Sequence, residues 1–322
     1  MSAKTSVIIC TYNYARFLLR CLKTALSQSQ PANEIIVVDD GSTDETPAVV
    51  SRFPSVRYIR QNRAGKAQAF NRGFRESQGD LICHLDADDY WLPNKLERVT
   101  ETLARCDAGG ILHEAVYVDA NDKYLYGSGS RTEGSSLAGH LSFQEVLLMC
   151  FIYRPPNATS GSLGVANTIT VRREAVMDCF PLPEDLGLAV DGALLLSAAR
   201  HGLVHLSEKL SAYRHHGKNS FVSAPGSMEF QSRLFKWVPT ISGVTATRDQ
   251  KLLRALVLET EAHSAAHNGK DPVGGAFGAA LLIPKLIRLG LVPHWKHLGL
   301  PVASLLGWRR VRRALPRVRV TS

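Results

Sequence analysis

The stretch Leu81-Ile-Cys-His-Leu-Asp-Ala-Asp-Asp89 decides which fold is expected of this chain, because an apolar run typical of a buried strand opens directly onto three carboxylates. Carboxylates desolvated side by side repel one another, so such a cluster is costly unless a cation lies among them. Divalent ions such as Mg²⁺ or Mn²⁺ take oxygen ligands and usually bridge to phosphates. The stretch therefore predicts a metal and diphosphate site at the carboxyl end of a strand, although an Asp-x-Asp pattern by itself is also common in solvated turns.

Strands and helices alternate through the first hundred residues. The apolar spacing predicts strands at 6–10, 34–39, 56–59 and 80–85 and helices at 17–26, 66–77 and 93–106, with a capping box at 42–45 that starts a further helix. Such repeated units imply an α/β fold with a doubly wound, mainly parallel sheet flanked by helices. Ligands bind beyond the carboxyl ends of the strands in sheets of this kind, so Asp39 and Asp40 are expected close to Asp86–Asp89.

The second part of the chain is less regular. Two strands are expected at 110–117 and 166–171, and a last strand ends at 211–214. Helical spacing is present at 191–201, 229–238 and 248–266, while Gly, Ser and Pro predict loops at 127–139 and 155–164. We expect one domain at 1–222 and a helical, basic C-terminal extension at 223–322.

Charge is distributed unevenly along the 322 residues, whose formal net charge is +9. After Asp271 the chain has no acidic residue but nine Lys or Arg residues, so this tail carries the whole excess. Trp295, Trp308 and several leucines accompany the basic cluster 309–319, which suits a helix on an anionic membrane surface. A helical subdomain packed on the core is the alternative. Nucleic acid is not expected as a partner, because no recognised binding motif accompanies the basic residues.

Neither a signal peptide nor a membrane-spanning segment is expected. The apolar run 6–10 is too short, and 277–292 is interrupted by Pro284 and two charged residues. The six cysteines are scattered without a C-x-x-C pair, which is typical of reduced thiols in a cytoplasmic protein. We therefore expect a cytoplasmic protein, peripheral on the inner face of the cell membrane.

Six ordered motifs together resemble the family 2 glycosyltransferases, which have the GT-A fold. They lie at 6–13, 36–44, 71–73, 79–80, 85–89 and 213–216, and the resemblance does not extend to the last hundred residues. It implies a metal-dependent, inverting, hexosyltransferase-like enzyme that uses Mn²⁺ or Mg²⁺. The implied donor is a nucleotide sugar, expected to be UDP-linked, and the acceptor is a hydroxyl of a glycan or lipid-linked glycan in cell-surface polysaccharide biosynthesis.

The resemblance also implies roles for individual residues. Asp88 would bind the metal directly, with Asp89 in support, and Asp86 would reach the ribose or a metal-bound water. His216 would lie near the metal and phosphates, with His215 as the alternative. The remaining donor-binding residues would be Thr11 and Asn13 beside the base, Asp39 accepting from the uracil N–H, with Asp40 as a weaker alternative, and Lys66 near the diphosphate.

Inverting transfer needs a carboxylate that takes the proton of the acceptor hydroxyl. In the family this is the Asp of a Glu-Asp pair that opens a helix, eleven residues before a Gly. Asp191 stands eleven residues before Gly202, but Val190 replaces the Glu, and Gly192 stands where an aromatic residue often follows. Asp191 is the expected base, and the pair Glu184–Asp185 is the competing candidate.

Two other functions stay open from the sequence. A nucleotidyltransferase also places a metal among acidic residues on such a sheet, but it usually has a Gly-rich, basic phosphate loop where this chain has Thr11-Tyr-Asn-Tyr14. A non-catalytic glycan- or nucleotide-binding partner of another transferase is the second alternative, because the Glu before Asp191 is missing.

Overall fold

The computed structural model describes residues 3–127, 139–143, 166–216 and 227–241, together with single positions within 146–150 and 250–256. The strands are β1 (Thr5–Thr11), β2 (Glu34–Asp39), β3 (Arg57–Arg60), β4 (Leu81–Asp86), β5 (Tyr90–Trp91), β6 (Gly110–Asp119), β7 (Tyr124–Gly127), β8 (Gly139–Leu141), β9 (Ile169–Arg172) and β10 (Leu203–His215). The helices are α1 (Ala15–Leu26), α2 (Thr46–Val50), α3 (Lys66–Glu76), α4 (Lys95–Leu103), α6 (Arg173–Val176), α7 (Val190–Ala199) and α9 (Ser227–Trp237). Short 3₁₀ segments are η1 (Ala166–Thr168), η2 (Met177–Cys179), η3 (Glu184–Leu186) and η4 (Val238–Thr240).

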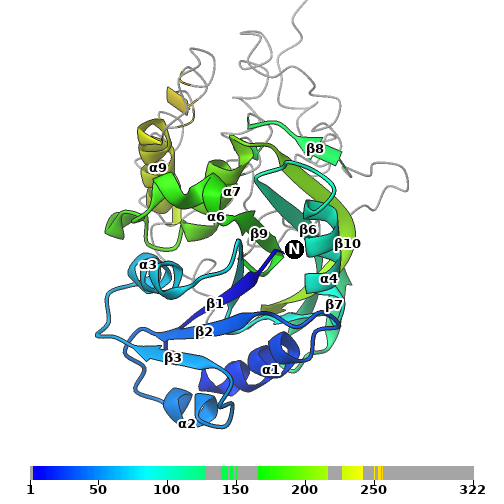
Figure 1. Ribbon diagram of the computed structural model, residues 1–322. Coiled ribbons are helices and arrows are strands. Elements are labelled where there is room, and N and C mark those ends of the chain that lie inside the picture. Colours follow the sequence, from blue (N-terminus) through cyan, green and yellow to red (C-terminus); the bar gives the residue numbers. More distant parts are fainter. Residues whose placement is uncertain are drawn as a thin grey trace, which may run out of the picture.

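One mixed sheet runs through the molecule in the order β3-β2-β1-β4-β9-β6-β10-β5, with β7 on β6 and β8 on β10 (Figure 1). The first four strands in this order pair in parallel, as the alternating pattern predicted. Strand β9 lies antiparallel between β4 and β6, and β6 pairs in parallel with β10. The carboxyl ends of β1, β2 and β4 therefore meet at one edge, where the predicted site residues lie.

Alternation along the strands divides the interior into two layers. Val7 and Ile9 of β1 pack with α1 and α4 in one hydrophobic cluster, whereas Ile8 packs with α3, α7 and α9 in the other. Leu81, Cys83 and Leu85 of β4 join the first cluster and Ile82 joins the second. Figure 1 shows α3 and α7 on one side of the sheet and α1 and α4 on the other. Side chains two residues apart on a strand share a face, so His84 and Asp86 lie on the α3 side.

The predicted capping box at 42–45 does not form. The Ser42 hydroxyl instead accepts the backbone N–H of Asn13 at 3.0 Å, and helix α2 begins only at Thr46. The side chain that contacts the start of this helix is Asp44, whose Oδ1 accepts the backbone N–H of Thr46 at 3.0 Å. The prediction was wrong because the local signal competed with a contact between distant loops.

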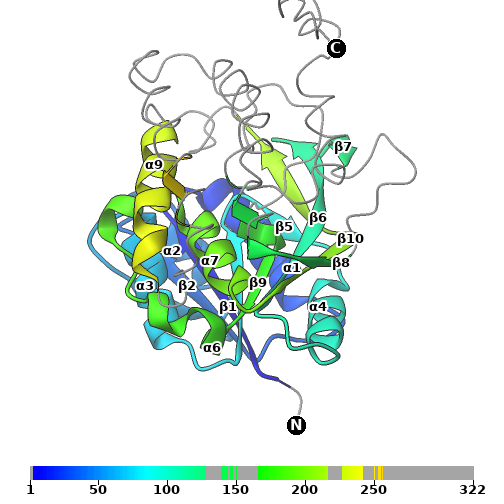
Figure 2. The ribbon, with the colours of Figure 1, turned by 90° about the horizontal axis from the view of Figure 1, so that it is seen from above.

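The C-terminal segment begins with a helix that belongs to the main core. Leu234 and Phe235 of α9 and Val238 of η4 are buried in the same cluster as α7, and Arg233 donates to the backbone carbonyl of Asp185 at 3.1 Å. Helix α9 lies beside α7 (Figure 2). The boundary at 222 stays a prediction. The described residues leave out most of the predicted loop at 127–139, the predicted loop at 155–164, most of the predicted helix at 248–266 and the basic tail. Within the described part of the chain, no helix combines the length and apolarity needed to cross a membrane.

Helix α3 approaches the sheet so closely that one position admits no side chain. A Cβ atom on Gly73 would lie 2.5 Å from Cγ2 of Ile8 and 3.3 Å from Cγ2 of Val38. Ala is favoured over Gly in helices by about 1 kcal/mol, but the clash reverses that preference, so Gly73→Ala is expected to lower the free energy of unfolding by about 1–3 kcal/mol. Urea denaturation measures the change. In an Ile8→Ala background the cost should be smaller, because only the 3.3 Å approach to Val38 remains tight, and a stabilising Gly73→Ala in the wild-type background would contradict the close packing.

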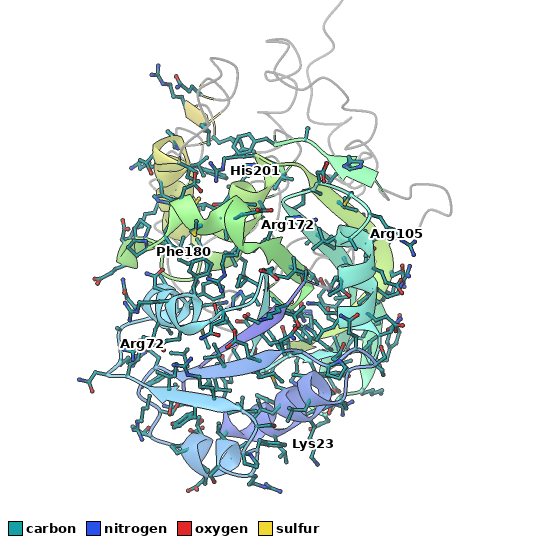
Figure 3. The ribbon with its side chains drawn as sticks, viewed as in Figure 1. Lys23, Arg72, Arg105, Arg172, Phe180 and His201 are labelled. Atoms are coloured by element: carbon teal, nitrogen blue, oxygen red, sulfur yellow. The ribbon has the colours of Figure 1, made fainter. Side chains whose placement is uncertain are left out.

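His113 makes stability depend on pH. Its fully buried imidazole lies on β6 with Nδ1 2.8 Å from the carbonyl oxygen of Glu114, and burial, with Lys95 nearby, lowers its pKa to about 3. In the unfolded chain the imidazole takes up a proton near pH 6.5, whereas in the folded protein it stays neutral, so acid favours unfolding. From this group alone, the free energy of unfolding should fall by about 2 kcal/mol between pH 7 and pH 5. Urea denaturation at both pH values should show a smaller decrease for His113→Gln. The exposed His201 (Figure 3) offers the matched control, because His201→Gln should keep the wild-type decrease. An identical decrease in all three proteins would rule out this assignment.

Candidate active site

The loop after β4 gathers three carboxylates. One oxygen from each of Asp86, Asp88 and Asp89 lies within 4.8 Å of the others. Asp89 is buried, and its Oδ1 accepts the backbone N–H of Arg214 at 2.8 Å, whereas its Oδ2 has no hydrogen-bond partner among the described residues. Burial raises the pKa of Asp89 well above its usual range, and the neighbouring Asp88 and Asp86 add to the rise. The loop therefore concentrates negative charge that a cation would stabilise.

Arg214 of β10 fixes the shape of this acidic loop. Its Nε donates to the backbone carbonyl of Asp88 at 2.7 Å, and its guanidinium pairs with Asp122 of the β6–β7 turn. The same group lies over the ring of Phe17, 4.9 Å from the centroid. The sequence motif at 213–216 indicated a histidine ligand but gave no role to Arg214. In the structure Arg214 is buried and holds the loop through its backbone.

The structure distinguishes the two adjacent histidines. His216 Nε2 lies 2.9 Å from Oδ2 of Asp88, and the His216 ring stacks on Phe17 with centroids 4.7 Å apart. His215 instead stacks on Tyr117, with centroids 5.4 Å apart. Of these two histidines, His216 is therefore the one that faces the acidic loop.

The donor set fits a hard divalent ion. Ligand atoms that occupy adjacent positions on an octahedral ion at about 2.1 Å lie about 3 Å apart, close to the separation of Asp88 Oδ2 and His216 Nε2. The oxygen-rich set and the unpartnered oxygen of buried Asp89 also suit Mg²⁺ or Mn²⁺. These residues could hold such an ion, and the roles of Asp88 and His216 as metal ligands stay predictions.

A second group of charges lies beside the loop. Lys66 Nζ is 2.8 Å from Oδ1 of Asp86 and 3.6 Å from Oδ1 of Asp191. Lys66 is the first residue of α3, and the turn before it is fixed by Asp40, whose Oδ2 accepts the backbone N–H of Gly65 at 2.8 Å. Asp40 therefore orients the start of α3, and this structural role explains its place at the strand end.

The charges in this group set one another's protonation. Burial would raise the pKa of Asp191, but the Lys66 ammonium and His84 together outweigh burial and hold that pKa below its usual range. Burial likewise would lower the pKa of Lys66, yet Asp191 and Asp86 raise it. For Asp86 burial prevails over Lys66 and the pKa is raised. Asp191 therefore stays ionised, as a general base must before it accepts a proton.

His84 also belongs to this site, although no sequence motif points to it. Its buried imidazole lies with Nδ1 3.0 Å from Oδ1 of Asp191 and Nε2 3.5 Å from Oδ1 of Asp86. The ring of Phe70 meets it edge-on, with centroids 4.7 Å apart. The available signal was a histidine in an otherwise apolar strand, two residues before Asp86 and on the same face.

The residues predicted to bind the nucleotide lie at the ends of β1 and β2. Thr11 and Asp39 are both buried, and Asp39 accepts the backbone N–H of Ser42 at 2.8 Å and the hydroxyl of Tyr58. Asn13 Oδ1 accepts the backbone N–H of Thr43 at 2.8 Å, so it joins the two loops. Their contacts with a base stay predictions.

Asn71 lies inside helix α3 and makes a tertiary contact. Its side-chain amide exchanges two hydrogen bonds of 2.8 Å with the backbone of Leu182. The neighbouring Arg72 lies on the outer side of α3 and pairs with Glu76 at 3.1 Å (Figure 3).

Asp191 lies in the first turn of α7, while the competing carboxylates Glu184 and Asp185 are exposed in η3. The family often has an aromatic residue at the position of Gly192. Here the absence of a side chain lets α9 pack close to α7. A Cβ atom there would lie 2.5 Å from Cδ2 of Leu234. The departure from the family pattern therefore has a packing reason, because the extension occupies the space beside the expected base.

Comparisons with known proteins identify the family of this chain. A profile described as glycosyl transferase family 2 matches residues 6–153. A glycosyltransferase of Nostoc sp. is 35% identical over 238 residues, which is 71% of this chain and 70% of the relative. This chain is a family 2 glycosyltransferase. Two other relatives match shorter parts. The glycosyltransferase GlyG of Streptococcus pneumoniae is 33% identical over 39% of this chain and 44% of its own length. Chondroitin synthase of Escherichia coli is 35% identical over 29% of this chain and 14% of its own length.

Solved structures show the same fold. The glycosyltransferase resembles residues 1–349 of TarS from S. aureus with a TM-score of 0.61 at 16% identity, over 98% of this chain and 93% of that one. The complex of that fragment with UDP-GlcNAc gives a TM-score of 0.60 at 17% identity, and the match covers 81% of this chain and 73% of the TarS chain. The GT-A fold predicted from the sequence is confirmed by this likeness.

The metal-binding prediction can be checked by thermal unfolding. Without metal, Asp88→Asn should raise the melting temperature, because it removes one of three repelling carboxylates. Mn²⁺ at about 100 times its dissociation constant should stabilise the wild type by about 2.7 kcal/mol and Asp88→Asn far less. Glu45→Gln, an exposed substitution away from the loop, should respond to Mn²⁺ like the wild type. An equal response of Asp88→Asn would contradict a metal site at Asp88.

Proposed function

We propose that this glycosyltransferase is a metal-dependent, inverting enzyme that moves a sugar from a UDP-linked donor to a hydroxyl of a glycan or lipid-linked glycan. The convergence of Asp191 with Lys66 and Asp86 supports this proposal best. It brings an ionised carboxylate from a distant segment to the strand edge that carries the acidic loop. TarS has been solved with UDP-GlcNAc and with UDP, and these ligands suggest the donor class.

Each residue then has a chemical task. Asp88 and His216 would hold Mn²⁺ or Mg²⁺, which when bound neutralises charge developing on the departing UDP. Thr11, Asn13 and Asp39 would hold the base. Asp86 would face the ribose side of the donor, and Lys66 would meet the diphosphate.

Transfer would proceed by one displacement. The acceptor hydroxyl oxygen attacks the anomeric carbon from the side opposite to UDP, and the bond from that carbon to the diphosphate oxygen breaks. Asp191 takes the hydroxyl proton, and UDP leaves with the bonding electron pair. Lys66 supports this step by keeping the Asp191 carboxylate ionised before the acceptor binds.

The acceptor and the setting belong to the same proposal. The relative that is a chondroitin synthase supports a role in cell-surface polysaccharide assembly. The basic tail after 271 would hold the enzyme at the anionic inner face of the cell membrane, where lipid-linked acceptors are found. Cosedimentation with vesicles containing phosphatidylserine, and its loss when 309–319 is neutralised, tests this part.

The chemical proposal is tested with a panel of UDP-sugars, Mn²⁺ and a measurement of released UDP. Asp191→Asn should bind UDP within about twofold of the wild type but lose transfer by about 10²–10⁴-fold, because only proton removal is affected. Glu184→Gln and Asp185→Asn provide matched controls that should keep transfer.

Other outcomes identify the alternatives. Transfer that survives in Asp191→Asn and fails in Glu184→Gln or Asp185→Asn would place the base in η3. A wild type that binds UDP with Mn²⁺ but releases none from any donor would support a non-catalytic binding partner.

A further inference from the structure

We infer that His84 is a positioning residue that fixes the Asp191 carboxylate relative to the sheet, an inference that rests on the proposed function of Asp191 as the base. His84 lies on β4, a central strand whose backbone pairs with β1 on one side and β9 on the other. Its side chain is fully buried and packed edge-on against Phe70, so the imidazole has a defined place.

The support for Asp191 comes from other elements. It lies in the first turn of α7 with its side chain 20% exposed, and Lys66 of α3 and His84 of β4 both approach its carboxylate. A general base must meet the acceptor hydroxyl within hydrogen-bond distance, so a loosely held carboxylate would lose rate.

Two side chains approach the same oxygen of Asp191. His84 Nδ1 lies 3.0 Å from Oδ1, although the alignment falls short of a hydrogen bond, and Lys66 Nζ lies 3.6 Å from it. The Lys66 side chain is flexible and also engages Asp86 at 2.8 Å, whereas the imidazole is short and held by the strand. Both contacts are made to Oδ1, so the other oxygen of the carboxylate, Oδ2, would be left for the acceptor hydroxyl.

His84 also faces Asp86, but at a greater distance, because Nε2 lies 3.5 Å from Oδ1. A role toward Asp86 would affect donor binding, whereas a role toward Asp191 would affect the chemical step. The two possibilities therefore separate in the kinetic constants.

The first test compares His84→Asn with His84→Leu. Asn and Leu have nearly the same shape and leave the same space beside Phe70, but only Asn places an amide N–H where Nδ1 was. With a UDP-sugar that the wild type uses, His84→Leu should lower kcat about 10–100-fold with KM for the donor within about twofold, and His84→Asn should stay within about fivefold of the wild-type kcat. Equal losses in both variants, or losses confined to the donor KM, would overturn the inference.

The second test needs no turnover. His84→Leu is made in the wild type and in Asp191→Asn, and thermal unfolding is measured for all four proteins. If His84 holds Asp191, the substitution should lower the melting temperature by about 2–4 °C more in the wild type than in the Asp191→Asn background. Equal decreases would overturn the contact. A wild type without transfer activity would refute the proposed function, while this cycle would still decide the role of His84.

Discussion

The site depends on the position of the Lys66 ammonium between the carboxylates of Asp86 and Asp191. Two like charges at a buried strand edge repel each other, and an ammonium 2.8 Å from one and 3.6 Å from the other relieves that cost. The same contact keeps Asp191 ionised and joins β4, α3 and α7, which are distant in sequence. The contact that relieves repulsion at this edge therefore also helps to keep Asp191 in the ionised form that its proposed role as base requires.

Much of the surrounding structure keeps that group in place. Asp40 fixes the turn that starts α3 and so delivers Lys66, while Gly73 lets the helix lie close on β1. Arg214 holds the acidic loop in a similar way. Its guanidinium donates to the backbone carbonyl of Asp88, and its backbone N–H donates to the Asp89 carboxylate. Asp40 and Arg214 belong to motifs of the sequence resemblance, but in the structure they orient the backbone that carries Lys66 and the acidic loop.

Helix α9 changes how the extension is understood. Its apolar residues complete the cluster around α7, and Leu234 fills the space that Gly192 leaves open beside Asp191. The first part of the extension therefore shapes the neighbourhood of the expected base, where an aromatic residue often stands in the family.

The sequence by itself determined the alternation of strands and helices, the acidic loop after β4, the family and the candidates Asp88, Asp191 and Lys66. These features are local, because apolar periodicity and short motifs are written in neighbouring residues. Only the tertiary structure decided that Asp191 and not Glu184 or Asp185 meets Lys66, and that His216 and not His215 faces Asp88. It alone revealed His84 and Arg214 as parts of the site and excluded the capping box at Ser42. These outcomes depend on strand register and on contacts between distant segments, which no local pattern encodes.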